Sequence, residues 1–320
     1  MRLHGTDAGA ESGSRFRSVE LDSDVDTTSS SSGFVTRFAP SPTGLAHRGH
    51  AYSALTAFAA ARAAGGRFLL RLEDIDAARC RPAFAAAFLE DFAWLGLTWE
   101  TPVRRQSEHL GDYRAALEQL RARGLVYRCF KTRKDILDDI GRAPHGSPTA
   151  PVGGPLPAAE EDALLAQGRP YAWRLSLDAA RRIQGGFDGL DFIEEGAGPD
   201  GERGRIAARP DLAGDVILAR KDLGVAYHLA VVVDDARQGV SHVIRGNDLF
   251  AAVHIQRLLQ ALLDLPTPIY RHHPLLMRPD GRRFAKRDGA ETVRDLRENG
   301  VSPAALRARL GFADLLAETD

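Results

Sequence analysis

Apolar positions along the chain recur at two spacings, which predict an alternation of strands and helices. Short apolar runs with β-branched or aromatic residues indicate strands, as does the alternating pattern at 171–177. Apolar residues at helical spacing indicate helices, as does an alanine-rich run at 51–64. Strands are predicted over 34–36, 67–72, 171–177, 188–193, 215–219 and 241–246. Helices are predicted over 51–64, 81–95, 107–124, 158–167, 291–299 and 302–310, with a further helix capped by Asn247 or Asp248 and ending at Leu263. This order predicts an α/β fold.

The stretch 34–50 joins a strand, a rigid polar loop and the beginning of a helix. Its apolar run ends at prolines and a glycine, which neither continue a central strand nor open a helix interior. The N–H groups and the dipole of a helix N-terminus in this arrangement receive anions, usually phosphate. His47 and His50 would share one helix face there and could donate to the same phosphate group. The alternative is that both residues only cap the helix.

Charged residues follow two predicted strands near the point where each strand ends. One strand leads into Glu73, Asp74 and Asp76, and another carries Arg245 close to its end. Ligands of open α/β sheets bind at the carboxyl ends of the strands, so these residues are candidates for a binding site. The alternatives are a solvated acidic strand end and a surface salt bridge.

Composition narrows the class of protein. The 320 residues can bury a large core, and a net charge of −1 argues against a basic surface over the whole chain, although a local basic face could still hold a nucleic acid. Two cysteines, Cys80 and Cys129, provide no disulfide framework and favour a reducing compartment. The sequence has no apolar stretch long enough to span a bilayer and no signal-peptide core, so we expect a cytoplasmic protein without membrane contact.

Three motifs stand out: HRGH at 47–50, RFAPSPTG at 37–44 and RFAKR at 283–287. The last lies in a basic loop bounded by glycines, 281–289, which suits a segment that reaches over a bound nucleotide. With these motifs the sequence resembles a class I aminoacyl-tRNA synthetase of the glutamate type. HRGH stands where that family has its HIGH signature, and RFAKR stands where it has KMSKS. RFAPSPTG is close to diagnostic for the glutamyl and glutaminyl branch.

The resemblance covers nearly all of the chain from Phe34 onward and implies a fold. This is a Rossmann-like nucleotide-binding fold with an inserted α+β lobe and a short helical C-terminus. The two halves of the catalytic domain would occupy 34–126 and 215–280, and the inserted lobe 127–214. Residues 281–320 would form the KMSKS-like loop and the C-terminal helices. Residues 1–33, rich in Ser, Gly, Asp and Glu, are expected to be a disordered tail.

The resemblance also implies which residues act on ATP, whose Mg²⁺ is expected with it. His47 and His50 would donate to the phosphates, with Gly49 between them in the ATP site. Lys286 would neutralise the pyrophosphate as it forms. Because negative charge gathers on phosphoryl oxygens, activation of an amino acid needs positioning and electrostatic stabilisation and no covalent nucleophile. The expected catalytic residues are therefore His47, His50 and Lys286.

A second set of residues is implied to bind L-glutamate. Arg37 would face the side-chain carboxylate bidentately, and Ser41 would add a hydroxyl contact. Glu73 and Tyr227 would hold the ammonium group. Arg245 would add positive charge for a substrate carboxylate.

The sequence departs from the family pattern at two places. The family often holds zinc through a Cys-x-Cys pair and two later residues, but here Cys129 is followed by Lys131 in the second position. Cys129 and His145 alone would not make a four-ligand site, so no zinc is expected. In the KMSKS-like motif, Arg283 and Ala285 replace the first lysine and the serine, while the second lysine is kept.

The end of the chain after two short helices predicts that there is no anticodon-binding domain. This narrows the resemblance to the truncated paralogues of the family, the glutamyl-queuosine tRNA(Asp) synthetases. They pass glutamate to the queuosine base in the anticodon loop of tRNA(Asp), and a monomer is expected. A ligase for tRNA(Glu) and a catalytically silent module that binds tRNA or glutamate are the alternatives. Candidates for phosphate contacts to the RNA, or for a merely solvated basic face, are Arg271, Arg278, Arg282, Arg283 and Arg287.

Overall fold

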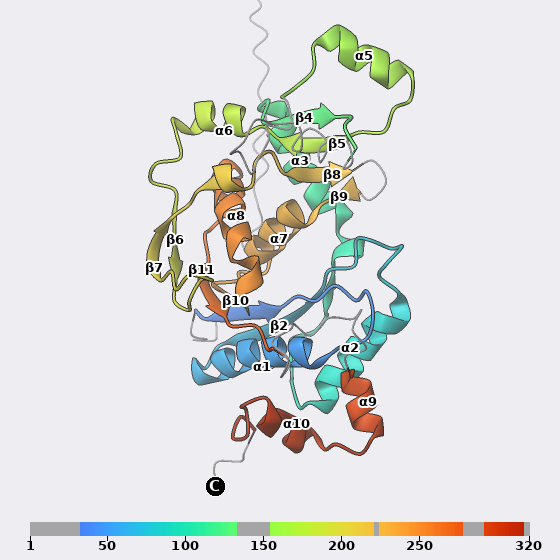
Figure 1. Cartoon of the computed structure of the whole chain (residues 1–320), viewed down its shortest axis with the longest axis vertical. Helices are drawn as coiled ribbons and strands as arrows, with labels where there is room; N and C mark the ends of the chain where they lie inside the picture. Colours follow the sequence, from blue (N-terminus) through green and yellow to red (C-terminus); the bar gives the residue numbers. More distant parts are fainter. Residues whose placement is uncertain (1–32, 133–153, 221–223, 278–290, 317–320) are drawn as a thin grey trace, which may run out of the picture. The chain divides into compact units, whose positions relative to one another are not determined.

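A seven-stranded sheet, parallel except at one edge, forms the centre of the structure (Figure 1). The computed structural model describes residues 33–132, 154–220, 224–277 and 291–316, all of which lie in the compact unit Ser31–Asp320. In spatial order the strands are β3 (Arg104–Arg105), β2 (Arg67–Leu72), β1 (Val35–Phe38), β10 (His242–Gly246), β11 (Ile269–His273), β6 (Asp191–Glu194) and β7 (Gly204–Ala207). The chain leaves β1 toward β2 on one side, while β10 pairs with β1 on the other. This reversal of strand order is where open α/β sheets bind ligands.

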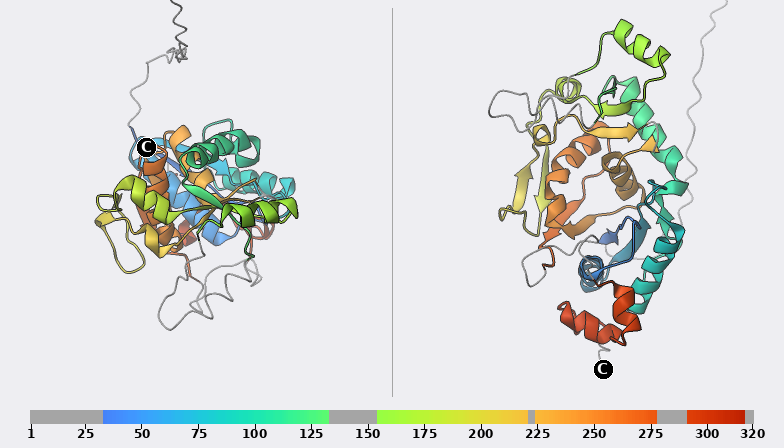
Figure 2. Two further views of the ribbon diagram at one scale, coloured as in Figure 1. Left: turned by 90° about the horizontal axis from the view of Figure 1, so that it is seen from above. Right: turned by 45° about the vertical axis from the view of Figure 1, so that its right-hand side comes forward.

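Helices cover the two faces of this sheet, and the alternation of side chains along β2 shows which helices lie on which face. Phe68 and Leu70 pack with the apolar residues of α1 (Arg48–Ala63) and α2 (Pro82–Trp94). Leu69, which points to the other face, packs with α3 (Leu110–Ala122), α7 (Tyr227–Arg237) and α8 (Phe250–Leu262). Figures 1 and 2 show this separation of α1 from α7 and α8. The structure confirms the predicted α/β fold.

A second, four-stranded antiparallel sheet forms the α+β lobe. Its order is β4 (Val126–Cys129), β5 (Ala172–Leu175), β8 (Ile217–Arg220) and β9 (Gly224–Val225). Two helices accompany it, α5 (Ala158–Ala166) and α6 (Leu177–Gln184). Ser176 caps α6 by accepting from the Ala179 N–H, and Gly185 ends it in the left-handed region with φ of 69°.

The predicted C-terminal helices are present as α9 (Val293–Glu298) and α10 (Pro303–Arg309). Thr292 and Ser302 cap them through side-chain oxygens that accept backbone N–H groups, and Pro303 occupies the first turn of α10. Leucines of both helices join the apolar cluster of α1 and α2. Packing against the catalytic core therefore holds these short helices in place.

The structure adds two sheet assignments to the sequence-based description and corrects one helix cap. β6 and β7, which fall within the stretch assigned to the inserted lobe, extend the main sheet because β6 pairs with β11. β8 and β9, beyond that stretch, belong to the second sheet. Neither Asn247 nor Asp248 caps α8, because both lie in the 3-10 turn η3 (Asn247–Leu249) and Leu249 holds the cap position. The domain limits themselves stay a prediction. Within the described ranges, no helix has both the length and the apolar character needed to cross a membrane.

Candidate active site

A cavity of about 510 Å³ opens at the carboxyl ends of β1 and β10, beside the N-terminus of α1. The strand order reverses at this point, so the two strand ends and the helix N-terminus face one space. The residues implied for ATP and glutamate that fall in the described ranges all line it: Arg37, Ser41, His47, Gly49, His50, Glu73, Tyr227 and Arg245. Asp74 and Asp76 do not line it, because Asp74 accepts from Ser107 and Asp76 pairs with Arg79. The structure thus brings together residues from four separate parts of the chain.

His47 and His50 form a reciprocal cap at the N-terminus of α1. The Nδ1 atom of His47 accepts from the N–H groups of Gly49 at 3.1 Å and His50 at 3.3 Å, and His50 Nδ1 accepts from the His47 N–H at 3.2 Å. The two rings are stacked with their centroids 3.7 Å apart. Both histidines therefore cap the helix, and a contact to a phosphate group stays a prediction. Since Nδ1 accepts in both rings, each neutral imidazole carries its proton on Nε2, where it can donate.

Close packing around His47 explains two neighbouring residues. A Cβ atom at Gly49 would lie only 3.0 Å from Cε1 of His47, so a larger residue would displace the ring. On its other side, His47 forms an antiparallel bridge with Thr292, and the Val293 N–H donates to the Ala46 carbonyl at 2.8 Å. The chain that follows the predicted KMSKS-like loop therefore returns to the beginning of α1.

Arg37 points toward α7 and pairs with Asp235. Its Nε and one terminal nitrogen donate to the two carboxylate oxygens of Asp235 at 2.9 and 3.2 Å, and the side chain is 5% exposed. Asp235 therefore occupies the edge of the Arg37 guanidinium that was expected to bind a substrate carboxylate bidentately. A substrate contact is left to the second terminal nitrogen of Arg37.

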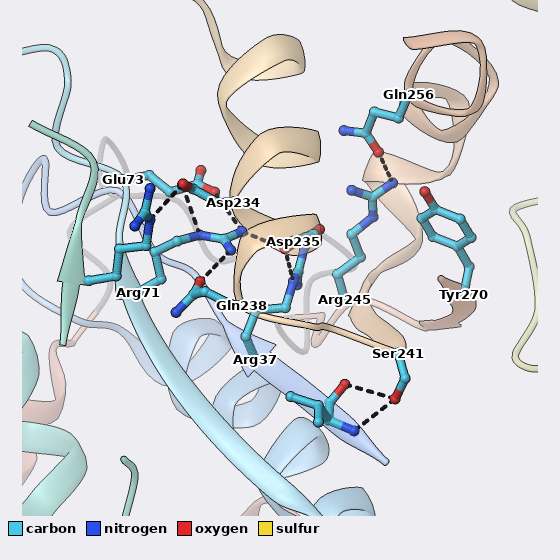
Figure 3. A network of polar contacts seen from close by, with 12 residues as sticks. Arg37, Arg71, Glu73, Asp234, Asp235, Gln238, Ser241, Arg245, Gln256 and Tyr270 are labelled. Carbon is cyan, nitrogen blue, oxygen red and sulfur yellow. Dashed lines mark hydrogen bonds and ion pairs between the residues drawn. The ribbon is translucent and has the colours of Figure 1, made fainter. Parts of the chain in front are cut away.

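Arg71, on the next strand, completes a buried charge network (Figure 3). It is fully buried and donates to Asp235 at 2.8 Å and to Gln238 at 2.9 Å. Its Nε lies 3.5 Å from Asp234, and a terminal nitrogen lies 3.8 Å from Glu73. The nearby carboxylates outweigh the effect of burial and raise the pKa of Arg71 above its ordinary value. Because alternate residues of a strand share a face, Arg71 on β2 points to the same helix, α7, as Arg37 on β1. Glu73, the first residue after β2, continues this alternation.

Glu73 stands between this network and the cavity. Burial raises the pKa of Glu73 to about 7, and the positive charges of Arg71 and Arg37 oppose that shift without cancelling it. The carboxyl group can therefore hold or release a proton near neutral pH. An ammonium ion placed beside it would favour the charged form.

Glu73 is predicted to hold the ammonium of glutamate, so we expect the affinity for glutamate to fall as the pH drops below about 7, where that ammonium would compete with a proton on Glu73. Isothermal titration with glutamate between pH 5.5 and 8 measures this dependence. Glu73→Gln should bind glutamate more weakly at pH 8 and show little change over the same range. Equal pH dependence in both proteins would exclude Glu73 as the titrating group.

Arg245 reaches the cavity from β10, beside Tyr227 at the beginning of α7. One terminal nitrogen donates to the Tyr227 hydroxyl at 3.3 Å, and the other donates to the Leu249 carbonyl at 3.1 Å and to Gln256 at 3.0 Å. Figure 3 shows the Arg245 guanidinium directed at the Gln256 amide. Arg245 is 6% exposed, which contradicts the alternative of a surface salt bridge.

Several residues around the cavity were not predicted. Asp234 and Asp235 form the acidic end of an apolar run, and that placement was the only signal for them in the sequence. Further residues lining the cavity come from the loop after β1, from the last residues of β10 and β11 and from the segments after these two strands: Ala39, Pro40, Gly246, Asp248, Leu249, His273, Leu275 and Leu276. The spacing of residues along the sequence could not indicate which of these segments lie together at the cavity.

Other predicted residues lie elsewhere or outside the described ranges. Arg271 pairs with Glu195 at 2.6 Å in a neighbouring hollow of about 960 Å³, which shares Ile244 and His273 with the cavity. Cys129 is buried in β4, and among the described residues no group of three or more His, Cys, Asp and Glu side chains could hold a metal ion. The remaining candidates are outside the described residues: His145, Arg278, Arg282, Arg283, Lys286 and Arg287.

A family model described as tRNA synthetases class I (E and Q), catalytic domain, matches residues 34–315. The chain therefore belongs to this family of ATP-using ligases, and its mixed α/β architecture is that of the class I catalytic domain.

Among its relatives, the glutamyl-Q tRNA(Asp) synthetase of Rhodobacter capsulatus is 47% identical over 282 residues, which is 87% of this chain and 100% of the relative. The enzyme of the same name from Nocardia farcinica is 43% identical over 86% of this chain and 82% of the relative. A crystal structure of a glutamate tRNA ligase from Elizabethkingia meningosepticum, in complex with its amino acid, superposes with a TM-score of 0.62 at 25% identity. That match covers 81% of this chain and 53% of the ligase, so the chain spans about half of that structure.

Proposed function

We propose that this protein activates L-glutamate with ATP and transfers the glutamyl group to the queuosine base in the anticodon loop of tRNA(Asp). The observation that carries the activation step is the single cavity lined by Arg37, Glu73 and Arg245 together with the helix N-terminus at His47 and His50. The similarity to relatives named glutamyl-Q tRNA(Asp) synthetase supports the choice of acceptor.

In the first step an oxygen of the glutamate α-carboxylate attacks the α-phosphorus of ATP, and the bond to the leaving pyrophosphate breaks. Glu73 and Tyr227 hold the ammonium group, Arg37 binds the side-chain carboxylate, and Ser41 adds a hydroxyl contact. Arg245 contributes positive charge near a carboxylate. This orientation brings the attacking oxygen toward the phosphates at the beginning of α1.

The same helix N-terminus stabilises the charge that develops on the phosphates. His47 and His50 donate from Nε2, and Lys286 neutralises the departing pyrophosphate, whose Mg²⁺ comes with ATP. In the second step a hydroxyl of the cyclopentene-diol of queuosine attacks the glutamyl carbonyl, and AMP leaves. The reaction is expected to take place in the cytoplasm, where tRNA and ATP are available.

Two assays test this function. The protein should catalyse pyrophosphate exchange when glutamate is present and tRNA is absent. If it does not, the protein would be a catalytically silent binding module. Transfer of labelled glutamate should then occur to tRNA(Asp) that carries queuosine and not to the same tRNA without it. The chain is also 39% identical to glutamate–tRNA ligase 1 of Paracoccus denitrificans. Transfer of glutamate to tRNA(Glu) would therefore contradict the proposed acceptor and indicate a ligase for tRNA(Glu).

Lys286→Ala should depress the kcat of pyrophosphate exchange by about 10²–10³, because one donor to the developing charge is removed. Binding of glutamate should change little, which titration can measure. Lys131→Ala, which removes an exposed lysine two residues after β4, is the matched control and should retain activity. If Lys286→Ala weakened glutamate binding while turnover held, Lys286 would not have this role.

A further inference from the structure

Three buried residues on neighbouring strands are connected in series behind the cavity. Glu194 on β6 lies 2.6 Å from Nδ1 of His272 on β11, and Nε2 of His272 lies 3.1 Å from Nε of Arg245 on β10. Glu194 and His272 are 1% and 2% exposed. Neither of these two residues lines the cavity of about 510 Å³, whereas Arg245 does.

The chemistry of the three groups determines where the protons are. An arginine Nε always carries its proton, so Nε2 of His272 must accept from Arg245. A neutral imidazole that accepts at Nε2 has its proton on Nδ1, and this proton is donated to Glu194. Burial lowers the pKa of His272 and outweighs the opposite effect of the hydrogen bond to Glu194, so the ring is neutral.

The carboxylate of Glu194 is itself held in one orientation. Its Oε1 accepts from the backbone N–H groups of His272 and Gly196, both at 2.8 Å, which leaves Oε2 for the imidazole. Burial alone would raise the pKa of Glu194, but the hydrogen bonds from His272 and Gly196 outweigh this effect and lower it. The carboxyl group therefore stays ionised. A Cβ atom at Gly196 would come within 2.1 Å of the His272 carbonyl oxygen, so this turn requires glycine.

We propose that Glu194 is a positioning residue that selects the tautomer of His272, and that His272 thereby orients the Arg245 guanidinium toward the substrate. The contact at Nε fixes the plane of the guanidinium. Its terminal nitrogens then meet Leu249, Gln256 and Tyr227, and the edge beside Tyr227 faces the cavity. This inference rests on the proposed function, in which Arg245 binds a carboxylate of glutamate.

Glu194→Gln tests the inference because it preserves the shape of the side chain and changes only the proton arrangement. The two backbone N–H groups hold the amide oxygen at the Oε1 position, so the amide NH₂ faces His272 Nδ1. The imidazole then accepts at Nδ1 and carries its proton on Nε2, opposite the N–H of Arg245. Two donors face each other, and Arg245 loses its fixed orientation.

Two readouts are expected. In the substrate-free protein, the ¹⁵N shifts of histidine should place the His272 proton on Nδ1 in the wild type and on Nε2 in Glu194→Gln. In pyrophosphate exchange, the KM for glutamate should rise about 10- to 100-fold, the factor for losing a hydrogen bond to a charged group, while kcat changes less. Glu195→Gln, one residue along and paired with the partly exposed Arg271, should change neither readout.

A double variant shows whether Glu194 acts through the imidazole. His272→Phe removes the acceptor, so adding Glu194→Gln to it should raise the KM no further. A wild-type proton on Nε2 of His272 would overturn the inference whether or not the variants fold, and so would an unchanged KM in a folded Glu194→Gln. If the wild type shows the expected tautomer but has no exchange activity with glutamate, the proposed function fails and the tautomer assignment stands.

Discussion

Asp235→Ala is expected to lower the free energy of unfolding by about 3–5 kcal/mol, because it leaves two buried guanidinium groups without their shared carboxylate. Asp235 accepts from Arg37 at 2.9 and 3.2 Å and from Arg71 at 2.8 Å, and neither arginine side chain is more than 5% exposed. The positive charges of Arg37 and Arg71 hold the pKa of Asp235 below its usual value against the opposing effect of burial. Domains are stable by only about 5–15 kcal/mol, so this loss would be a large fraction of the total.

Urea unfolding followed by circular dichroism measures this change. Glu100→Ala is the matched control, because it also removes a carboxylate that pairs with an arginine, Arg67, at 2.5 Å. Both of those side chains are 44% exposed, so the expected loss is below about 1 kcal/mol. Asp235→Asn keeps the shape and one acceptor oxygen and should fall between the two. A loss in Asp235→Ala no greater than in Glu100→Ala would contradict the assignment of Asp235 as the centre of the network.

His50→Ala is expected to lower the kcat of pyrophosphate exchange by about 10²–10³, because it removes one of the groups that we propose to donate to the phosphates. The KM for glutamate should change little, since the glutamate contacts come from other elements. The same substitution removes the acceptor of the His47 N–H, which costs about 1 kcal/mol of stability. Loss of the cap and loss of catalysis must therefore be separated.

His50→Asn makes that separation. The asparagine side-chain oxygen can take the place of Nδ1 and accept from the His47 N–H, but nothing occupies the position of Nε2. The kcat should fall about as far as in His50→Ala, while the urea midpoint stays near that of the wild type. If His50→Asn restored the kcat as well as the cap, His50 would only cap the helix, and other groups would have to donate to the phosphates.

Local patterns in the sequence were sufficient to predict most of the helices and strands of the catalytic domain. Prolines at 40 and 42, a glycine at 44 and the alanine-rich run after them require a strand, a loop and a helix in that order, because each depends on neighbouring residues alone. The cap residue at the beginning of α8 was wrong in the sequence-based description, and no pattern in the sequence showed that β6 and β7 pair with the main sheet. Short strands of four residues carry too little pattern to show which sheet they join.

The sequence by itself indicated, through motifs that resemble a family, most of the charged and polar residues that line the cavity. Only the tertiary structure decided what those residues meet. Asp235 lies 198 residues from Arg37, and Glu194 lies 78 residues from His272, yet each pair is in hydrogen-bond contact. Burial excludes water from these groups, so each charge requires a protein partner, and the packing of α7 and β6 against the strands supplies it.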